Sequence, residues 1–253
     1  MRGYVIRRII AHRGHKVGAP EQTEAAFRLA AGLGATILEA DLRFTRDGVP
    51  VLMHDQALER TTSGRGPVEA ADWNEVAQLD AGGWFSDEFV GERILRLDEL
   101  FEIAAELSVG LCIEAKGEAT RNAQAALYAA REIKRRSRLD VDYVASFNHA
   151  ALAAAAEEVS GLRTAPDRLP ERGHSTAHEL IEQARSARAQ VIQHHFADLL
   201  PAVVDEVQAA GIEVWAWPMA NAEEARFAYD AGAIGLMADD VKAVSDLLRT
   251  QAD

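Results

Sequence analysis

Acidic side chains end two of the extended segments that the sequence predicts. Glu39 and Asp41 close the segment 36–41, and Glu114 closes the segment 110–114. Because side chains alternate across a strand, Glu39 and Asp41 point to the same side. Carboxylates crowded at the same end of neighbouring strands cost free energy unless a positive charge lies between them. The pattern therefore favours one divalent cation, Mg²⁺ or Ca²⁺ with Mn²⁺ as a further option, over the alternative of solvated strand ends.

Two histidines follow short apolar runs at what would be the same end of the fold. His12 comes directly after the segment 7–11, and His54 follows the extended run 49–53. Histidine exchanges a proton near neutral pH, so such a pair can supply a general base and a general acid. Arg13 and Lys116 offer positive charge for phosphate oxygens. The other six histidines are interpreted as structural or solvated: His15, His149, His174, His178, His194 and His195.

Short apolar segments alternate with longer, alanine-rich amphipathic stretches along the whole chain. The predicted strands cover residues 7–11, 36–41, 110–114, 143–147, 162–165, 190–193, 212–217 and 234–238. The predicted helices cover residues 21–33, 96–107, 119–136, 149–159, 176–187, 197–210, 221–231 and 241–249. Such alternation implies parallel strands joined by right-handed crossovers. About eight units favour a closed (β/α) TIM-type barrel of the α/β class, with an open doubly wound sheet as the alternative.

One segment interrupts this rhythm between the second and third strands. Residues 49–93 are too many for a simple connection, and they are rich in glycine, aspartate and aromatic residues. We expect one TIM-barrel catalytic domain, residues 1–253, in which 49–93 forms an inserted cap lobe. The cap would lie over one end of the barrel.

Charge and composition exclude several classes of protein. The net charge of -13 disfavours nucleic acid as a partner, because phosphate backbones select clustered lysine and arginine. Since Cys112 is the one cysteine, no internal disulfide can form, which fits a cytoplasmic location. Apolar runs are too short for stable membrane insertion. Residues 1–10 are basic and partly apolar, but Arg7 and Arg8 interrupt them, so a signal peptide is not expected.

Several motifs, taken in order, resemble the glycerophosphodiester phosphodiesterase family. They are His12-Arg13-Gly14, Pro20-Glu21-Gln22-Thr23, Glu39-Ala40-Asp41, Thr45-Arg46-Asp47-Gly48-Val49-Pro50-Val51, His54-Asp55, Arg60-Thr61-Thr62-Ser63-Gly64 and Glu114-Ala115-Lys116. The resemblance implies a barrel fold, a divalent metal on Glu39, Asp41 and Glu114, and acid–base roles for His12 and His54. It also implies phosphate contacts from Arg13 and Lys116. Glu21 matches a family motif near the site, and we expect it to contact the substrate.

The second half of the chain departs from the family pattern. A Trp-Thr-Val-Asn-like run is replaced by Trp217-Pro218-Met219-Ala220-Asn221, and a Thr-Asp-x-Pro ending by Ala238-Asp239-Asp240-Val241. Gln22 stands where the family usually has asparagine. These departures leave the alcohol part of the substrate open, while Trp217 is expected to line the pocket.

The expected reaction is metal-dependent hydrolysis of a small glycerophosphodiester to glycerol 3-phosphate and an alcohol. One alternative is a lysophospholipase D-type lipid phosphodiesterase, whose acyl channel Trp73, Trp84, Phe85 and Phe89 would line. Others are a non-catalytic phosphate-binding barrel, and an aldolase or isomerase that uses Lys116 as a Schiff base. The alanine-rich outer helices would allow a homodimer.

Overall fold

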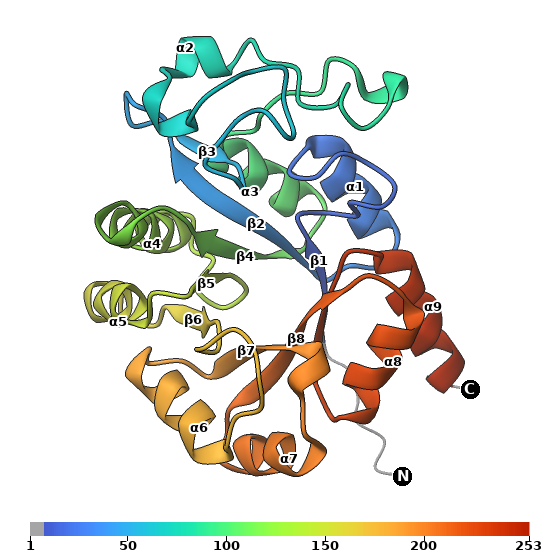
Figure 1. The fold of residues 1–253 in the computed structure, drawn as a ribbon. Coiled ribbons are helices and arrows are strands. Elements are labelled where there is room, and N and C mark those ends of the chain that lie inside the picture. Colours follow the sequence, from blue (N-terminus) through green and yellow to red (C-terminus); the bar gives the residue numbers. More distant parts are fainter. Residues whose placement is uncertain (1–7, 253) are drawn as a thin grey trace.

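Within residues 8–252, which the computed structural model describes, eight parallel strands form a nearly closed barrel (Figure 1). Their order is β6-β5-β4-β2-β1-β9-β8-β7, and a parallel bridge between Asp167 and Gln193 joins the two ends. The expected TIM-type barrel is thereby confirmed. The strands are β1 (Arg8–His12), β2 (Ile37–Phe44), β4 (Gly110–Ala115), β5 (Tyr143–Ser146), β6 (Arg163–Pro166), β7 (Val191–His195), β8 (Glu213–Met219) and β9 (Gly235–Ala238).

The strand register brings the predicted site residues side by side. β1 and β4 both pair with β2, on its two sides. In this register His12 lies opposite Glu39, and Asp41 lies opposite Glu114. His12 and Glu114 sit at or near the carboxyl ends of β1 and β4, the end at which the active sites of such barrels are built. β2 continues to Phe44 rather than ending at the predicted residue 41, so Glu39 and Asp41 lie within this strand, beside the ends of its neighbours.

Helices follow the strands and cover the outside of the barrel (Figure 1). They are α1 (Glu24–Gly32), α3 (Leu97–Glu106), α4 (Ala119–Arg135), α5 (His149–Glu158), α6 (Ala177–Ser186), α7 (Pro201–Ala209), α8 (Ala222–Asp230) and α9 (Val241–Ala252). Thr23 and Thr176 cap α1 and α6 by accepting backbone N–H groups. The helix predicted over 197–210 begins only at Pro201, because proline suits the first helical position and η3 (Phe196–Asp198) precedes it.

Alanine determines how closely the helices approach the sheet. α4 buries Ala125, Ala126, Ala129 and Ala130 against the strands, and these small side chains permit close packing. Trp215, Tyr143 and Cys112 belong to one buried apolar cluster that is separate from the helix-packed core. Cys112 is thus a core thiol, as expected. No helix among the described residues is long and apolar enough to cross a membrane.

The segment after β2 departs from the alternation of strands and helices seen in the rest of the barrel. β3 (Pro50–Leu52) pairs antiparallel with the end of β2, and η1 (Val68–Ala70), α2 (Trp73–Val76) and η2 (Asp87–Phe89) follow. The segment has a small apolar core of its own, formed by Val51, Met53, Leu58, Val68, Val76, Ala81 and Ile94. In Figure 1 it lies at the top of the view, beyond the end of β2. Of the predicted strand 7–11, residue 7 lies outside the described residues, as do residues 1–7 of the basic start.

Candidate functional site

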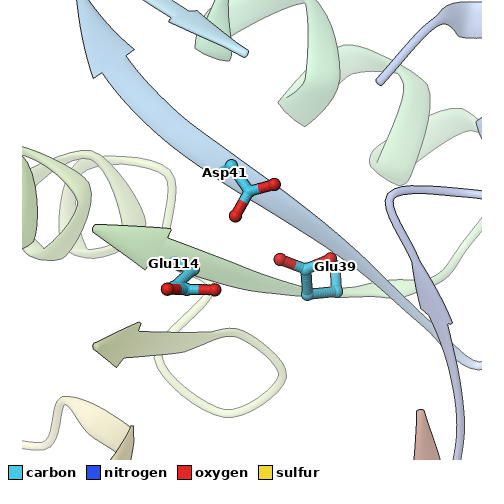
Figure 2. Close-up of side chains that lie close together, drawn as sticks. All are labelled: Glu39, Asp41 and Glu114. Atoms are coloured by element: carbon cyan, nitrogen blue, oxygen red, sulfur yellow. The ribbon is translucent and has the colours of Figure 1, made fainter. Parts of the chain in front are cut away.

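Three carboxylates from two neighbouring strands converge at the barrel mouth (Figure 2). One oxygen from each of Glu39, Asp41 and Glu114 lies within 4.8 Å of the others. Oxygens that share one ion, each about 2.0–2.6 Å from it, lie at most about 5 Å apart. The three side chains therefore have the spacing that a hard divalent cation requires.

Burial makes this cluster electrostatically costly. Glu39 is 2% exposed and Asp41 is 0% exposed. Burial, followed by the charges of Asp41 and Glu114, raises the pKa of Glu39 well above its ordinary value. Burial likewise raises the pKa of Glu114. Glu39 Oε1 has no hydrogen-bond partner, which is the pattern expected of an oxygen that a cation would satisfy.

Lys116 and Arg13 supply positive charge beside the carboxylates. Lys116 Nζ lies 2.6 Å from Glu114 Oε1 and 3.1 Å from Asp41 Oδ1. Arg13 Nε lies 3.1 Å from Asp41 Oδ2. Burial alone would raise the pKa of Asp41, but the charges of Lys116 and Arg13 outweigh it and lower that pKa. Burial would lower the pKa of Lys116, yet the carboxylates raise it, so this amine is protonated and unsuited to forming a Schiff base.

A strained turn after β1 places Arg13. Its φ is +60°, and Gly14 follows with φ +88°. A Cβ on Gly14 would lie 2.6 Å from the Cβ of Ala26, so glycine is needed for the turn to pack on α1. In return the backbone N–H of Arg13 donates to Glu39 Oε2 at 2.9 Å. The turn thus positions both the guanidinium group of Arg13 and the carboxylate of Glu39.

Glu21 links the turn to the segment that carries His54. Its Oε1 accepts from Arg13 Nη1 at 3.3 Å and from Arg60 Nη2 at 2.8 Å, and its Oε2 accepts from Arg60 Nη1 at 2.9 Å. Arg60 also donates to Asp55, the neighbour of His54. Glu21 is buried behind the cavity, so its contacts indicate that it positions arginines.

His12 is held by a residue from the far end of the chain. Its Nδ1 lies 2.6 Å from Asp239 Oδ1, and Lys16 Nζ lies 2.9 Å from the same oxygen. Since the carboxylate only accepts, His12 Nδ1 carries the proton, and the 3.2 Å approach of Lys16 to that nitrogen is a neighbouring charge. Burial lowers the pKa of His12 to about 4, with the charges of Arg13 and Lys16 adding to it and the hydrogen bond to Asp239 opposing it.

His54 has an equivalent arrangement within one short segment. Its Nδ1 donates to Asp55 Oδ1 at 2.7 Å, and its backbone carbonyl accepts from Arg43 Nη2 at 2.8 Å. Burial lowers the pKa of His54 as well. In both histidines Nδ1 is tied to a carboxylate, so Nε2 is the ring nitrogen left to exchange a proton.

One cavity of about 360 Å³ joins these groups. It is lined by His12, Arg13, Glu39, His54, Glu114, Lys116, Ala145, Phe147, Asp167, Glu171, Gln193, Trp217, Pro218 and Met237. Trp217 thus lines the pocket as expected, with its ring centroid 6.0 Å from that of Phe147. Of the predicted residues, Asp41 and Glu21 are packed behind this surface and contact the residues that form it.

Several residues at the site had no predicted role. Asp239 follows β9 and contacts His12 only because β9 pairs with β1. Gln22 donates to Asp41 Oδ2 at 2.6 Å. Its place in the Pro20–Thr23 motif, where the family usually has asparagine, is the sequence signal that could have pointed to this contact. Asp167 and Gln193 line the cavity without any sequence signal. His15 accepts from the backbone of Val241, and the other histidines without a predicted role are likewise absent from the cavity wall.

Comparisons with known proteins agree with this geometry. The model of the glycerophosphoryl diester phosphodiesterase family matches residues 12–243. A glycerophosphodiester phosphodiesterase of Caldanaerobacter subterraneus is 30% identical over 244 residues, which are 95% of this chain and 97% of the relative. A phosphodiesterase of Oleispira antarctica, solved with the product sn-glycerol-3-phosphate, superposes with a TM-score of 0.88 at 26% identity, covering 96% of this chain and 97% of that one. A glycerophosphodiester phosphodiesterase of Agrobacterium tumefaciens gives a TM-score of 0.81 at 26% identity, covering 94% and 99%. The chain therefore belongs to the glycerophosphoryl diester phosphodiesterase family and is an enzyme of that class.

Proposed function

We propose that the enzyme hydrolyses glycerophosphodiesters to glycerol 3-phosphate and an alcohol in a metal-dependent reaction with His12 and His54 as the acid–base pair. The single observation that carries the proposal is the meeting of three carboxylates, two histidines and two cations around one cavity. The product held by the Oleispira antarctica relative supports glycerol 3-phosphate as the product here.

Glu39, Asp41 and Glu114 would hold the ion, with Mg²⁺ and Ca²⁺ the preferred candidates and Mn²⁺ a further one. Their all-oxygen donor set and the unpartnered Glu39 Oε1 fit a hard cation. When bound, such an ion supplies Lewis-acid neutralisation of the phosphate charge.

Arg13 and Lys116 would contact the other phosphate oxygens. Both are charged and both line the cavity. Fixed cations stabilise the charge that gathers on a phosphoryl group as it is attacked. Glu21 would keep Arg13 pointed at the phosphate through their ion pair.

His12 and His54 would divide the proton transfers between them. With Nδ1 tied to a carboxylate in each case, Nε2 is the atom that takes or gives the proton. One imidazole deprotonates the nucleophile and the other protonates the leaving alcohol, so rate against pH should be bell-shaped. The nucleophile is water or the neighbouring glycerol hydroxyl. Rapid quenching separates these, because hydroxyl attack passes through a cyclic phosphate that can be isolated.

Residues 49–93 would form a cap over the barrel mouth. This role is supported by His54, which this segment contributes to the cavity wall. The cap aromatics pack on one another: the ring centroids of Trp84 and Phe85 lie 5.7 Å apart, and those of Phe85 and Phe89 lie 5.5 Å apart. This packing favours the small diester over a lysophospholipid that needs an acyl channel.

The decisive experiment is a substrate panel assayed after chelation and again with each metal restored. We expect the enzyme to release glycerol 3-phosphate from glycerophosphodiesters, to lose activity in the presence of a chelator, and to recover it when a divalent ion is added. Turnover of lysophosphatidylcholine above glycerophosphocholine would support the lipid phosphodiesterase instead. Full activity in chelator would rule out the metal-dependent mechanism.

A further inference from the structure

The cavity has a second wall that the proposed reaction does not use. Two of its residues directly follow strands, Phe147 after β5 and Asp167 after β6. The others are Gln193 within β7, Trp217 within β8 and Glu171 in the loop after β6. We call these five residues the acidic wall. It lines the same cavity as His12, Arg13 and Lys116, which come from β1 and β4 and their following turns.

The backbone of Asp167 is held by hydrogen bonds, but one oxygen of its carboxyl group has no hydrogen-bond partner. The residue is 4% exposed, its backbone N–H donates to Ser146 O at 3.2 Å, and its carbonyl accepts from His149 Nε2 at 2.7 Å. Its Oδ2 atom has no hydrogen-bond partner. A buried carboxylate oxygen without a partner is costly, so a ligand that donates a hydrogen bond there would be stabilised.

Gln193 presents a second acceptor on the same wall. It is 2% exposed, and its Nε2 donates to Ala165 O at 2.9 Å. That bond fixes the amide orientation and leaves Oε1, which has no partner, as the free atom. The indole Nε1 of Trp217 is the one unpartnered donor on the acidic wall within the described chain.

Nearby arginines do not neutralise these carboxylates. Arg168 donates to Ser175 and to the carbonyl of His174, and Arg172 contacts His195 Nδ1 at 2.8 Å. The cations that line the cavity, Arg13 and Lys116, are paired with Asp41 and Glu114. With a divalent ion held by Glu39, Asp41 and Glu114, the side of the proposed phosphate contacts would be net positive, whereas the other side carries the carboxyl groups of Asp167 and Glu171. Burial and the charge of Glu114 raise the pKa of Asp167, and a cation bound beside it would lower that pKa again.

We propose that the acidic wall is a subsite for the alcohol part of the diester and selects an alcohol that carries a primary ammonium group. This inference rests on the proposed function, since it places the phosphate between Arg13 and Lys116. An anionic phosphate joined to a cationic alcohol matches the charge separation of the cavity. Ammonium N–H groups suit the two acceptors on Asp167 and Gln193, while the rings of Phe147 and Trp217 pack the methylene groups.

The test compares glycerophosphoethanolamine with glycerophosphopropanol, in which a methyl group replaces the ammonium. The measurement is the ratio of kcat/KM for the two diesters with the metal-loaded enzyme. We expect the wild type to prefer the ammonium diester by about tenfold or more, as a buried charge pair provides. D167N should reduce that ratio to about threefold or less. D230N, which changes an exposed carboxylate of α8 that is outside the cavity wall, serves as the matched control and should leave the ratio unchanged.

A second variant keeps the test decisive if D167N folds poorly. E171Q changes an exposed loop residue of the same wall and should lower the ratio by about twofold to fivefold. Equal turnover of the two diesters by the wild type would overturn the subsite, as would a ratio that neither variant changes. Glycerophosphocholine, which lacks N–H groups, should fall below glycerophosphoethanolamine, and the reverse order would also contradict the primary-ammonium assignment. If no glycerophosphodiester is hydrolysed at all, the proposed function itself is wrong, which is a different outcome.

Discussion

His12 Nδ1 lies 2.6 Å from Asp239 Oδ1, although 227 residues separate the two in sequence. The contact follows from the register of β1 with β9, in which Ala11 lies opposite Ala238, so the next residue of each strand meets its counterpart. Asp239 selects the imidazole tautomer that carries its proton on Nδ1. Burial lowers the pKa of His12 to about 4, with a contribution from the charge of Lys16, which contacts the same oxygen of Asp239.

Replacing Asp239 with Asn should lower kcat more than it raises KM. The amide can donate to Nδ1 and so favours the wrong tautomer, with Nε2 protonated; we expect a loss of roughly 10²-fold in kcat. Steady-state kinetics with glycerophosphoethanolamine measure both parameters. D240N is the matched control, because that neighbouring carboxylate is absent from the cavity wall: it caps α9 by accepting from Ala243 N at 3.0 Å and lies 4.0 Å from His15 Nδ1. An unaltered kcat in folded D239N would show that Asp239 has no positioning role.

Removing either imidazole should abolish most turnover without releasing the metal. H12A and H54A are each expected to lose roughly 10²- to 10⁴-fold in kcat, since each deletes one proton-transfer group. Calorimetric titration with Mn²⁺ reports metal binding independently, and it should change little because the carboxylates remain. If both variants kept near-full turnover with bound metal, the acid–base assignment would be refuted.

Replacing Glu39 with Gln should weaken metal binding without lowering the stability of the metal-free protein. The neutral amide relieves repulsion among the buried carboxylates, so after chelation the variant should melt at the same temperature as the wild type or higher. The wild type should gain thermal stability with added Mg²⁺ or Ca²⁺, because a ligand that binds only the folded state stabilises it. E39Q should lose most of that gain. Scanning calorimetry with and without the ion measures it, and an equal gain in E39Q would place the ion elsewhere.

Buried His194 should make stability fall as the solution becomes acidic. Burial lowers the pKa of His194, whose Nδ1 donates to the carbonyl of His195 at 2.9 Å. The unfolded chain therefore binds more protons once the pH falls below about 6.5, and the folded state loses up to ~1.4 kcal/mol per pH unit from this group.

His194→Asn keeps a donor for that carbonyl but removes the titration. The difference in unfolding free energy between wild type and H194N should therefore narrow between pH 7 and pH 5, because groups shared by the two proteins cancel. Urea unfolding at each pH measures this difference. A gap that stays constant over the range would show that His194 titrates normally in the folded protein.

Local pattern was enough to predict most of the fold. Apolar runs separated by alanine-rich amphipathic stretches predicted the number and order of the eight barrel strands. This was possible because the spacing of apolar residues and the residues that cap helices are local properties of the chain. Helix α7 differs most from its predicted start, because Pro201 marks the first helical position and the preceding residues form η3 instead. The antiparallel pairing of β3 with β2 needed the structure, since the tertiary pairing of a three-residue strand has little local signal.

The sequence by itself determined the three carboxylates, the two histidines and the two cations, so the carboxylate cluster and half of the residues that line the cavity could be predicted. Only the tertiary structure decided that Asp239 meets His12, that Arg60 meets Glu21, and that Asp167 and Gln193 face the same cavity. The physical reason is that barrel closure sets the register between β1 and β9, and the approach of β6 to β7, through contacts distant in sequence. Alternation tells which way a side chain points within its own strand, but only closure decides which side chain from another strand it meets.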